Sequence, residues 1–137
     1  RLMPLARVIT PSMPEAEILA GCPITGEGDF DRIARKLSGN DKVSVLLKAG
    51  HLSEERLVDY FYNAEDGTMT RLASQRVETQ NTHGTGCTLS SAIATCLSQG
   101  HPLHEAIATA KDYVTQAIDA AKDMQIGQGH GPLWHFV

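Results

Sequence analysis

Strand-like and helix-like segments alternate along the chain, and this alternation limits its fold more than any other feature of the sequence. Residues 7–10 and 43–48 are short runs rich in aliphatic and β-branched side chains, as is typical of buried strands. Residues 12–20 and 30–37 lie between them and have the polar starts and glycine ends of capped helices. Strands that alternate with helices predict an α/β fold, in which helices cover a sheet.

The middle of the chain predicts a β-hairpin. Residues 57–62 and 68–72 are two β-rich runs, and residues 63–67 between them have the composition of a turn that ends in glycine. A further short strand is expected at residues 76–79.

Two helices are expected towards the end of the chain. The first carries Leu89, Ile93 and Leu97 on one face, and the glycine and proline within residues 100–102 end it. The second is the clearest element of the sequence, because its apolar residues recur at three- and four-residue steps: Leu103, Ile107, Ala110, Val114, Ile118 and Ala121. The tail at residues 127–132 has too many glycines to be helical.

The composition limits the partners and the compartment. With 137 residues, 42% of them hydrophobic, the chain is long enough for one domain with a sizeable core. Its net charge of −4 gives no electrostatic reason to expect nucleic acid or an anionic membrane as a partner. Its longest apolar runs are far shorter than the ~20 residues that span a bilayer. Cys22, Cys87 and Cys96 form no CxxC pair, which argues against a zinc ribbon or a disulfide framework and favours the reducing cytoplasm.

The segment from Asn81 to Ala92 carries the most chemical information. A strand is expected to lead into a turn that contains Gly84 and Gly86, and the turn opens directly into a helix. Glycine lets the backbone adopt unusual dihedral angles and approach a ligand closely. The N–H groups of a first helical turn have no partner inside the helix, and the helix dipole adds positive potential there. The pattern therefore favours an anion site, most obviously for a phosphoryl group.

Cys87 lies where that potential would act. A helix N-terminus stabilises a thiolate, so Cys87 is a candidate to take a proton from a substrate hydroxyl or to act as a nucleophile. His83 is a candidate to orient groups or to contact phosphate. The residues alone leave two simpler interpretations open: a glycine turn without a ligand, and a cysteine that packs as a small hydrophobic side chain.

Several common motifs are excluded. The Walker A motif needs a lysine after its last glycine, and none follows Gly86. The dinucleotide fingerprint needs a third glycine where Leu89 stands. The glycines of residues 127–131 fail as well, because too little chain follows them to form a helix. The histidines show no HExxH or similar spacing, so no structural metal is expected.

Residues 81–92, which read N-T-H-G-T-G-C-T-L-S-S-A, resemble the signature of the bacterial hydroxymethylpyrimidine/phosphomethylpyrimidine kinases of thiamine biosynthesis, members of the ribokinase superfamily. Three further segments match in the same order: residues 10–17 (T-P-S-M-P-E-A-E), residues 48–51 (K-A-G-H), and residues 129–136, where G-H-G-P is followed by His135-Phe136. The resemblance covers essentially the whole chain but only about the C-terminal half of a family member. It implies a ribokinase-like α/β fold with a central, mostly parallel sheet flanked by helices. Residues 1–137 would be the C-terminal, ATP-binding part of that single domain.

The resemblance also implies a reaction. The family consists of kinases that use ATP and Mg²⁺. They phosphorylate the hydroxymethyl group of 4-amino-5-hydroxymethyl-2-methylpyrimidine, and then the resulting monophosphate. Gly84, Thr85, Gly86 and Cys87 correspond to the anion hole that stabilises the transferring phosphoryl group. Cys87 stands where other members of the superfamily have the aspartate that deprotonates the hydroxyl.

Further residues are assigned to the nucleotide and the metal by the same resemblance. Lys48 would lie near the nucleotide phosphates, and Glu15 ends an N-x-x-E motif that organises magnesium through water molecules. The expected nucleotide-binding set is completed by Thr10, Ser12, Thr82 and His83.

Two positions depart from the family pattern. Ser12 stands where the family usually has asparagine, and Ala49 stands where it usually has glycine. Ser12 keeps a hydroxyl group but is shorter, which puts the water structure around magnesium in question. Ser12 and Glu15 also have the spacing of a helix capping box, and both roles are compatible.

Three other functions remain open at this stage. Some family members accept vitamin B6, so a pyridoxal or pyridoxine kinase is the nearest alternative, and the residues that separate the two would come from the N-terminal half. A fragment that binds nucleotide but turns nothing over is the second. A hydrolase or transferase that uses Cys87 and His83 is the third.

Arg1 in place of an initiator methionine predicts that the chain is part of a longer protein whose N-terminal half is missing. A missing half would leave a sheet edge and apolar surface uncovered. We therefore expect the chain to associate with another copy, as a homo-oligomer, or with its missing N-terminal half.

Overall fold

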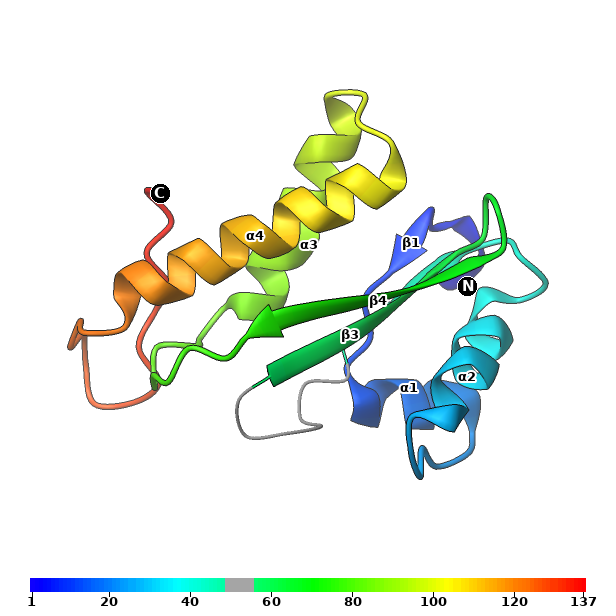
Figure 1. Cartoon of the computed structure of the whole chain (residues 1–137), viewed down its shortest axis with the longest axis horizontal. Helices are drawn as coiled ribbons and strands as arrows, with labels where there is room; N and C mark the ends of the chain where they lie inside the picture. Colours follow the sequence, from blue (N-terminus) through cyan, green and yellow to red (C-terminus); the bar gives the residue numbers. More distant parts are fainter. Residues whose placement is uncertain (49–55) are drawn as a thin grey trace. The chain divides into compact units, whose positions relative to one another are not determined.

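The computed structural model describes residues 1–48 and 56–137 (Figure 1). The chain divides into two compact units, Arg1–Ser74 and Gln75–Val137. The first unit holds the strands and two helices, and the second holds two longer helices and the C-terminal tail.

The strands form one sheet with a mixed pairing. They lie in the order β1 (Val8–Ile9), β2 (Ser44–Leu47), β3 (Arg56–Asn63) and β4 (Thr68–Gln75). β1 pairs parallel to β2, with Ile9 opposite Val45, and β2 pairs antiparallel to β3, with Leu46 opposite Phe61. All residues of β2 are buried, which explains its unbroken aliphatic run. The α/β fold is confirmed, but the described sheet is mixed and not mostly parallel, because β1 and β2 pair parallel whereas β2 and β3 pair antiparallel.

The two helices of the first unit form where the sequence predicts, except that the second begins two residues earlier than expected, at Gly28. A short 3-10 helix, η1 (Met3–Leu5), precedes β1. α1 (Met13–Ala20) follows Ser12, whose backbone N–H donates to the Glu15 carboxylate at 2.7 Å. This bond is one arm of the predicted capping box. α2 (Gly28–Ser38) packs against β2 and β3, and α1 packs against α2. The core between them contains Ala16, Phe30, Ile33, Leu37, Val45, Leu47, Tyr60 and Tyr62.

A left-handed turn connects α2 to β2. Gly39, Asn40 and Asp41 all have positive φ, at 63°, 62° and 59°. Two of these residues are not glycine, so the turn needs support from its surroundings. The buried Tyr62 supplies it, because its hydroxyl donates to the Asp41 carboxylate. That bond, together with burial, raises the pKa of Tyr62.

The second unit is built on a pair of helices, α3 (Thr85–Ser98) and α4 (Leu103–Ala121). They pack along each other (Figure 1). Both helices are confirmed, and their buried residues are Leu89, Ile93, Leu103, Ala106, Ile107, Ala110, Val114, Ala117 and Ala121. The predicted face residues Leu97 and Ile118 are half-buried.

The strand predicted at residues 76–79 is wrong, and so is the expectation that a strand leads into the glycine turn. The segment is irregular. The Thr79 hydroxyl donates to the carbonyl oxygen of Lys122 at 3.3 Å. A side-chain hydrogen bond to the end of α4 thus takes the place of backbone hydrogen bonds to another strand. An alternating sequence pattern cannot distinguish a strand from an irregular segment that is held in this way.

The C-terminal tail is not helical, as predicted. Leu133 is buried, and the Trp134 N–H donates to the carbonyl oxygen of Ala117 in α4 at 3.0 Å. The tail is therefore packed against its own unit.

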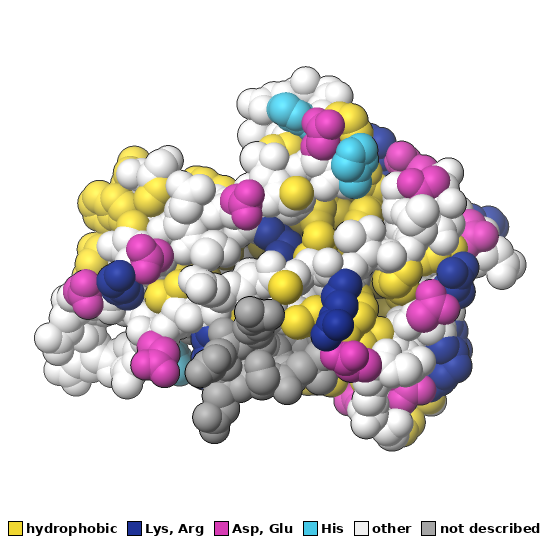
Figure 2. All heavy atoms as spheres, in the orientation of Figure 1, with side chains coloured by type: hydrophobic (Ala, Val, Ile, Leu, Met, Phe, Trp, Pro, Cys, Tyr) yellow, Lys and Arg dark blue, Asp and Glu magenta, His cyan; other side chains and the backbone are white. Residues whose placement is uncertain are grey.

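The surface carries charges of both signs. On the face drawn in Figure 2, acidic and basic side chains are interspersed, in keeping with the net charge of −4. Within residues 1–48 and 56–137, none of the helices combines the length and the apolar character needed to cross a bilayer.

Candidate active site

The turn before α3 is built around Gly84. Its φ of 87° lies in the left-handed region, which side chains other than glycine rarely adopt. Gly84 is the N-cap of α3, and Thr85 is the first helical residue. The predicted glycine turn that opens directly into a helix is confirmed.

The first turn of α3 leaves two backbone donors open. Thr85 is satisfied, because its N–H and its hydroxyl donate to the carbonyl oxygen of Thr82 at 3.3 and 2.7 Å. The N–H groups of Gly86 and Cys87 have no acceptor in the described part of the chain. Two open donors at the positive end of a helix dipole favour an anion in front of them.

The Cys87 thiol belongs to this turn and is exposed. It forms part of the wall of a pocket of about 600 Å³ between α3, α4 and the tail. The other lining residues are Thr88, Ser91, Ala92, Thr95, Cys96, Thr109, Ala110, Tyr113 and His135. A thiol beside open N–H donors is well placed to take a proton from a hydroxyl group that attacks a phosphorus atom bound there.

The tail contributes a histidine to this pocket. His135 Nε2 lies 2.9 Å from the Thr88 hydroxyl, and the Tyr113 hydroxyl donates to the His135 carbonyl oxygen at 2.9 Å. The two bonds connect the tail to α3 and to α4. The sequence indicated His135 only through the family's C-terminal motif, and it gave no sign of Tyr113, because helix packing rather than spacing brings them together.

Asn81 holds the segment that leads into the glycine turn. Its side chain is buried, and Nδ2 donates to the carbonyl oxygens of Ala121 and Met124 at 2.5 and 2.8 Å. Its Oδ1 lies against Gly131, where an added Cβ would be 1.8 Å from that oxygen. Asn81 therefore joins the loop, the end of α4 and the tail. From the sequence, Asn81 was recognised only as the first residue of the family signature at residues 81–92, and no structural role was predicted for it.

His83 acts in this structure through its backbone. Its N–H donates to the carbonyl oxygen of Gly131 at 3.1 Å, and its ring is on an exposed residue. Among the residues described, no hydrogen bond joins the His83 ring to the Cys87 thiol, which weakens the Cys–His alternative. Contacts of Thr82 and His83 with a nucleotide remain predictions.

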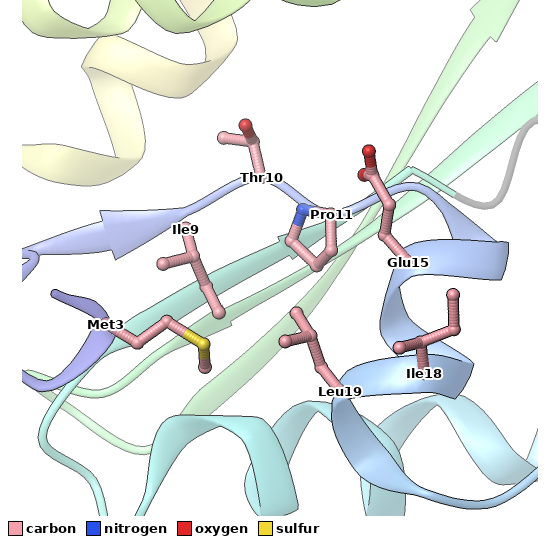
Figure 3. A pocket seen from close by; sticks show the side chains of 7 residues that line it. All are labelled: Met3, Ile9, Thr10, Pro11, Glu15, Ile18 and Leu19. Carbon is pink, nitrogen blue, oxygen red and sulfur yellow. The ribbon is translucent and has the colours of Figure 1, made fainter. Parts of the chain in front are cut away.

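The nucleotide residues expected in the first unit lie close together. Ser12 and Lys48 form a parallel bridge, and the Lys48 N–H donates to the carbonyl oxygen of Pro11 at 2.9 Å. The Ser12 backbone N–H, the Ser12 hydroxyl and the charge of Lys48 hold the pKa of Glu15 below its usual value. In Figure 3, the Thr10 hydroxyl and the Glu15 carboxylate point to the same side of the chain. Residues 49–51, the rest of the K-A-G-H segment, lie outside the described residues.

Glu15 fits a magnesium ion held through water. Mg²⁺ keeps several of its water molecules and is bound through one or two carboxylates together with substrate phosphates. The Glu15 carboxylate, whose lowered pKa favours the ionised form, can supply the carboxylate of such a site. A metal site made only of protein side chains would be a different arrangement. Within the described ranges, no group of three or more His, Cys, Asp or Glu side chains could form one.

Solved structures define the class of fold. The pyridoxal kinase of Bacillus subtilis, in an ADP complex, matches with a TM-score of 0.85 and 36% identity, over 98% of this chain and 49% of its own. The pyridoxal kinase of Staphylococcus aureus in complex with AMP-PCP matches with a TM-score of 0.86 and 29% identity, over 98% of this chain and 48% of its own. The fold is that of the ribokinase-like kinases.

The family follows from the sequence comparison. The chain belongs to the phosphomethylpyrimidine kinase family, whose model matches residues 1–134. The hydroxymethylpyrimidine/phosphomethylpyrimidine kinase of Rhizobium meliloti is 46% identical over 136 residues, which cover 98% of this chain and 50% of the relative. Its counterpart from Haemophilus influenzae is 41% identical over 138 residues, covering 99% and 51%. The chain thus spans about half the length of these relatives.

Proposed function

We propose that the protein containing this chain is an ATP-dependent kinase of thiamine biosynthesis, which phosphorylates hydroxymethylpyrimidine and then its monophosphate. The observation that carries the proposal is the first turn of α3. There the N–H groups of Gly86 and Cys87 are open, beside the exposed Cys87 thiol. The substrate class is supported by the names of the relatives, which are hydroxymethylpyrimidine/phosphomethylpyrimidine kinases.

The first turn of α3 would act on the phosphoryl group during transfer. The substrate's hydroxyl oxygen attacks the terminal phosphorus of ATP, a new P–O bond forms, and the bond to ADP breaks. Donation from Gly86 and Cys87 N–H stabilises the charge on the phosphoryl oxygens, because these donors are fixed before the reaction begins. Cys87 takes the proton that the hydroxyl releases. Gly84 sets the direction of the donors, and Thr85 closes the turn onto Thr82.

Residues of the first unit would serve the metal and the nucleotide. Glu15 would hold Mg²⁺ through water, and the ion, when bound, neutralises charge on the phosphates. Lys48 would contact phosphate, and Thr10 and Ser12 would contribute hydroxyl groups. The proximity of Ser12, Glu15 and Lys48 supports this assignment.

We also infer a cytoplasmic location. Cys22, Cys87 and Cys96 are all free thiols, and two of them are half-buried while Cys87 is exposed. Such thiols persist in a reducing compartment.

A vitamin B6 kinase is the second candidate, because pyridoxal kinases are among the solved structures with this fold. The test compares kcat/KM of the complete protein for the hydroxymethylpyrimidine and for pyridoxal, with ATP and Mg²⁺ in excess. We expect the higher value for the pyrimidine, and a second phosphorylation of its monophosphate. Phosphorylation of pyridoxal with no turnover of the pyrimidine would contradict the proposal.

A further inference from the structure

The start of α3 lacks the side chain that usually fixes the first turn of a helix. A capping serine, threonine or aspartate would accept a bond from the second or third N–H group of the helix. In α3 these are the N–H groups of Gly86 and Cys87, and the N-cap is Gly84. In the part of the chain that the structure describes, no side-chain bond caps this helix. The turn therefore keeps two donors open for an anion, but other contacts have to hold it in place.

The C-terminal tail, red in Figure 1, contacts the chain directly before this turn. The His83 N–H donates to the carbonyl oxygen of Gly131 at 3.1 Å, and His83 forms a parallel bridge with Pro132. The buried Asn81 side chain lies against Gly131. The residues that lead into the turn are thus bound to the tail.

The same tail contacts the chain directly after the turn. His135 Nε2 lies 2.9 Å from the Thr88 hydroxyl. The Thr88 N–H donates to the carbonyl oxygen of Gly84 at 2.8 Å, and this bond closes the first turn of α3. The residues between the two attachments, 84–87, are those of the proposed phosphate-binding turn. His135 therefore restrains the end of a segment whose start is restrained by the contacts of His83.

The tail can support the turn because it is itself bound to α4. Leu133 is buried, and the Trp134 N–H donates to the carbonyl oxygen of Ala117 at 3.0 Å. The Tyr113 hydroxyl donates to the carbonyl oxygen of His135 at 2.9 Å. These bonds fix the tail backbone at and beside residue 135, so a bond from the His135 ring passes that restraint on to α3.

We propose that His135 is a positioning residue for phosphoryl transfer, which acts through Thr88 to hold the open N–H groups of Gly86 and Cys87 in place. The inference rests on the proposed function and adds to it a role for the C-terminal tail. Donors that stabilise a transition state depend on their fixed orientation, and a small displacement costs much of their effect. Loss of the contact between His135 and Thr88 should therefore slow the transfer more than it weakens the binding of the nucleotide.

A role of the His135 ring in anchoring the tail is the alternative, and the contacts favour it less. His135 is exposed, whereas the neighbouring Leu133 is buried. The bond from Tyr113 reaches the backbone of His135 and does not depend on its ring. Removal of the ring should therefore leave the tail on α4 and release only Thr88.

The test compares variants of the complete protein in kcat and in two affinities. One affinity is for ADP, and the other is for ADP with aluminium fluoride, which mimics the transferring phosphoryl group. For His135→Ala we expect kcat and the affinity for the mimic to fall by roughly tenfold, while the affinity for ADP changes by less than about twofold. His135→Gln should restore most of the rate, because its amide can still bond to the Thr88 hydroxyl.

Thr88→Val removes the other partner of the contact and should have the same effects as His135→Ala. The double variant should be about as slow as either single variant, because both changes remove one and the same contact. His104→Ala is the matched control, since the His104 side chain is 68% exposed in α4 and lies outside the tail and the first turn of α3. It should leave kcat and both affinities unchanged.

Thermal unfolding checks that each variant folds. Equal rates for His135→Ala and His104→Ala would overturn the proposal, and so would additive losses in the double variant. A lower kcat with an unchanged affinity for the mimic would overturn it too, because a smaller fraction of folded protein gives that result.

The rates are measured with whichever alcohol, the hydroxymethylpyrimidine or pyridoxal, the unmodified protein phosphorylates faster. A wrong substrate assignment therefore changes the alcohol used and leaves the comparison of the variants intact. Absence of turnover with both alcohols would contradict the proposed function and, with it, the role of His135.

Discussion

Cys87 is the residue on which the proposed chemistry depends most. In the complete protein, Cys87→Ala should lower kcat by roughly 10²–10⁴-fold, because the variant has no group to take the proton of the hydroxyl. Cys87→Asp should keep more activity than Cys87→Ala, since a carboxylate can accept the same proton. The measurement is the steady-state rate with the hydroxymethylpyrimidine. A near-normal rate in the alanine variant would remove Cys87 from this role.

Glu15 gives a second prediction for a single residue. Its pKa is lowered by the Ser12 N–H, the Ser12 hydroxyl and the Lys48 charge, so its titration midpoint should lie below 4.5 in the folded chain. A lowered folded pKa means that the ionised carboxylate stabilises the fold above pH 4.5, and that this contribution is lost as the pH falls through the folded pKa. Carbon-detected NMR of the Glu15 carboxyl measures the midpoint.

Lys48→Met should raise that midpoint, and Lys36→Met on α2 serves as the matched control. Lys36 is not among the groups that shift Glu15, so its removal should leave the midpoint in place. Equal shifts in the two variants would show that general charge, and not the position of Lys48, sets the pKa of Glu15.

The roles of some site residues could be predicted from the sequence, and the roles of others could not. Gly84, Gly86 and Cys87 could be predicted, because the turn, its donors and the thiol belong to one short segment. The contacts of Asn81 with Ala121 and Met124 could not, because 40 and 43 residues separate the partners. An alternation or a helical period describes neighbours in the chain, whereas these contacts depend on how α4 and the tail pack.

Among the elements, the irregular C-terminal tail allows a direct test of packing, because Gly131 lies against the Asn81 side chain. In Gly131→Ala the new Cβ would lie 1.8 Å from Asn81 Oδ1, so the tail or the Asn81 bonds must shift. The free energy of unfolding should fall by roughly 1–3 kcal/mol, as for other overpacked sites. Gly129→Ala is the control, because nothing lies within 4 Å of its Cβ position. Urea unfolding of both variants measures the difference, and equal stabilities would show that Asn81 does not restrain the tail.

The elements themselves were largely predictable. α1 has a capping box, α1 and α2 both end at a glycine, and α3 and α4 have apolar residues at helical spacing, so local signals were sufficient. The strand predicted at residues 76–79 was wrong because the alternating pattern there is equally compatible with an irregular segment that forms a hydrogen bond to the end of α4. The mixed pairing could not be read from the runs at residues 43–48 and 57–62, since strand direction depends on the connection between them.

At the scale of the whole molecule, the chain holds the proposed phosphate-binding turn but spans about half the length of its relatives. By resemblance, the residues that select the substrate belong to the other half. We therefore expect residues 1–137 alone to bind nucleotide without robust turnover. Substantial kinase activity from this chain alone would contradict that expectation.

The central claim is that the first turn of α3 binds a nucleotide phosphate. Titration of ¹⁵N-labelled residues 1–137 with ADP, followed by amide NMR, tests it directly, and adenosine provides the control without phosphates. The account predicts that ADP shifts the amide signals of Gly86 and Cys87 more than most others, and that adenosine leaves these two in place. If those two signals stay unchanged at saturating ADP, the turn is not the phosphate site.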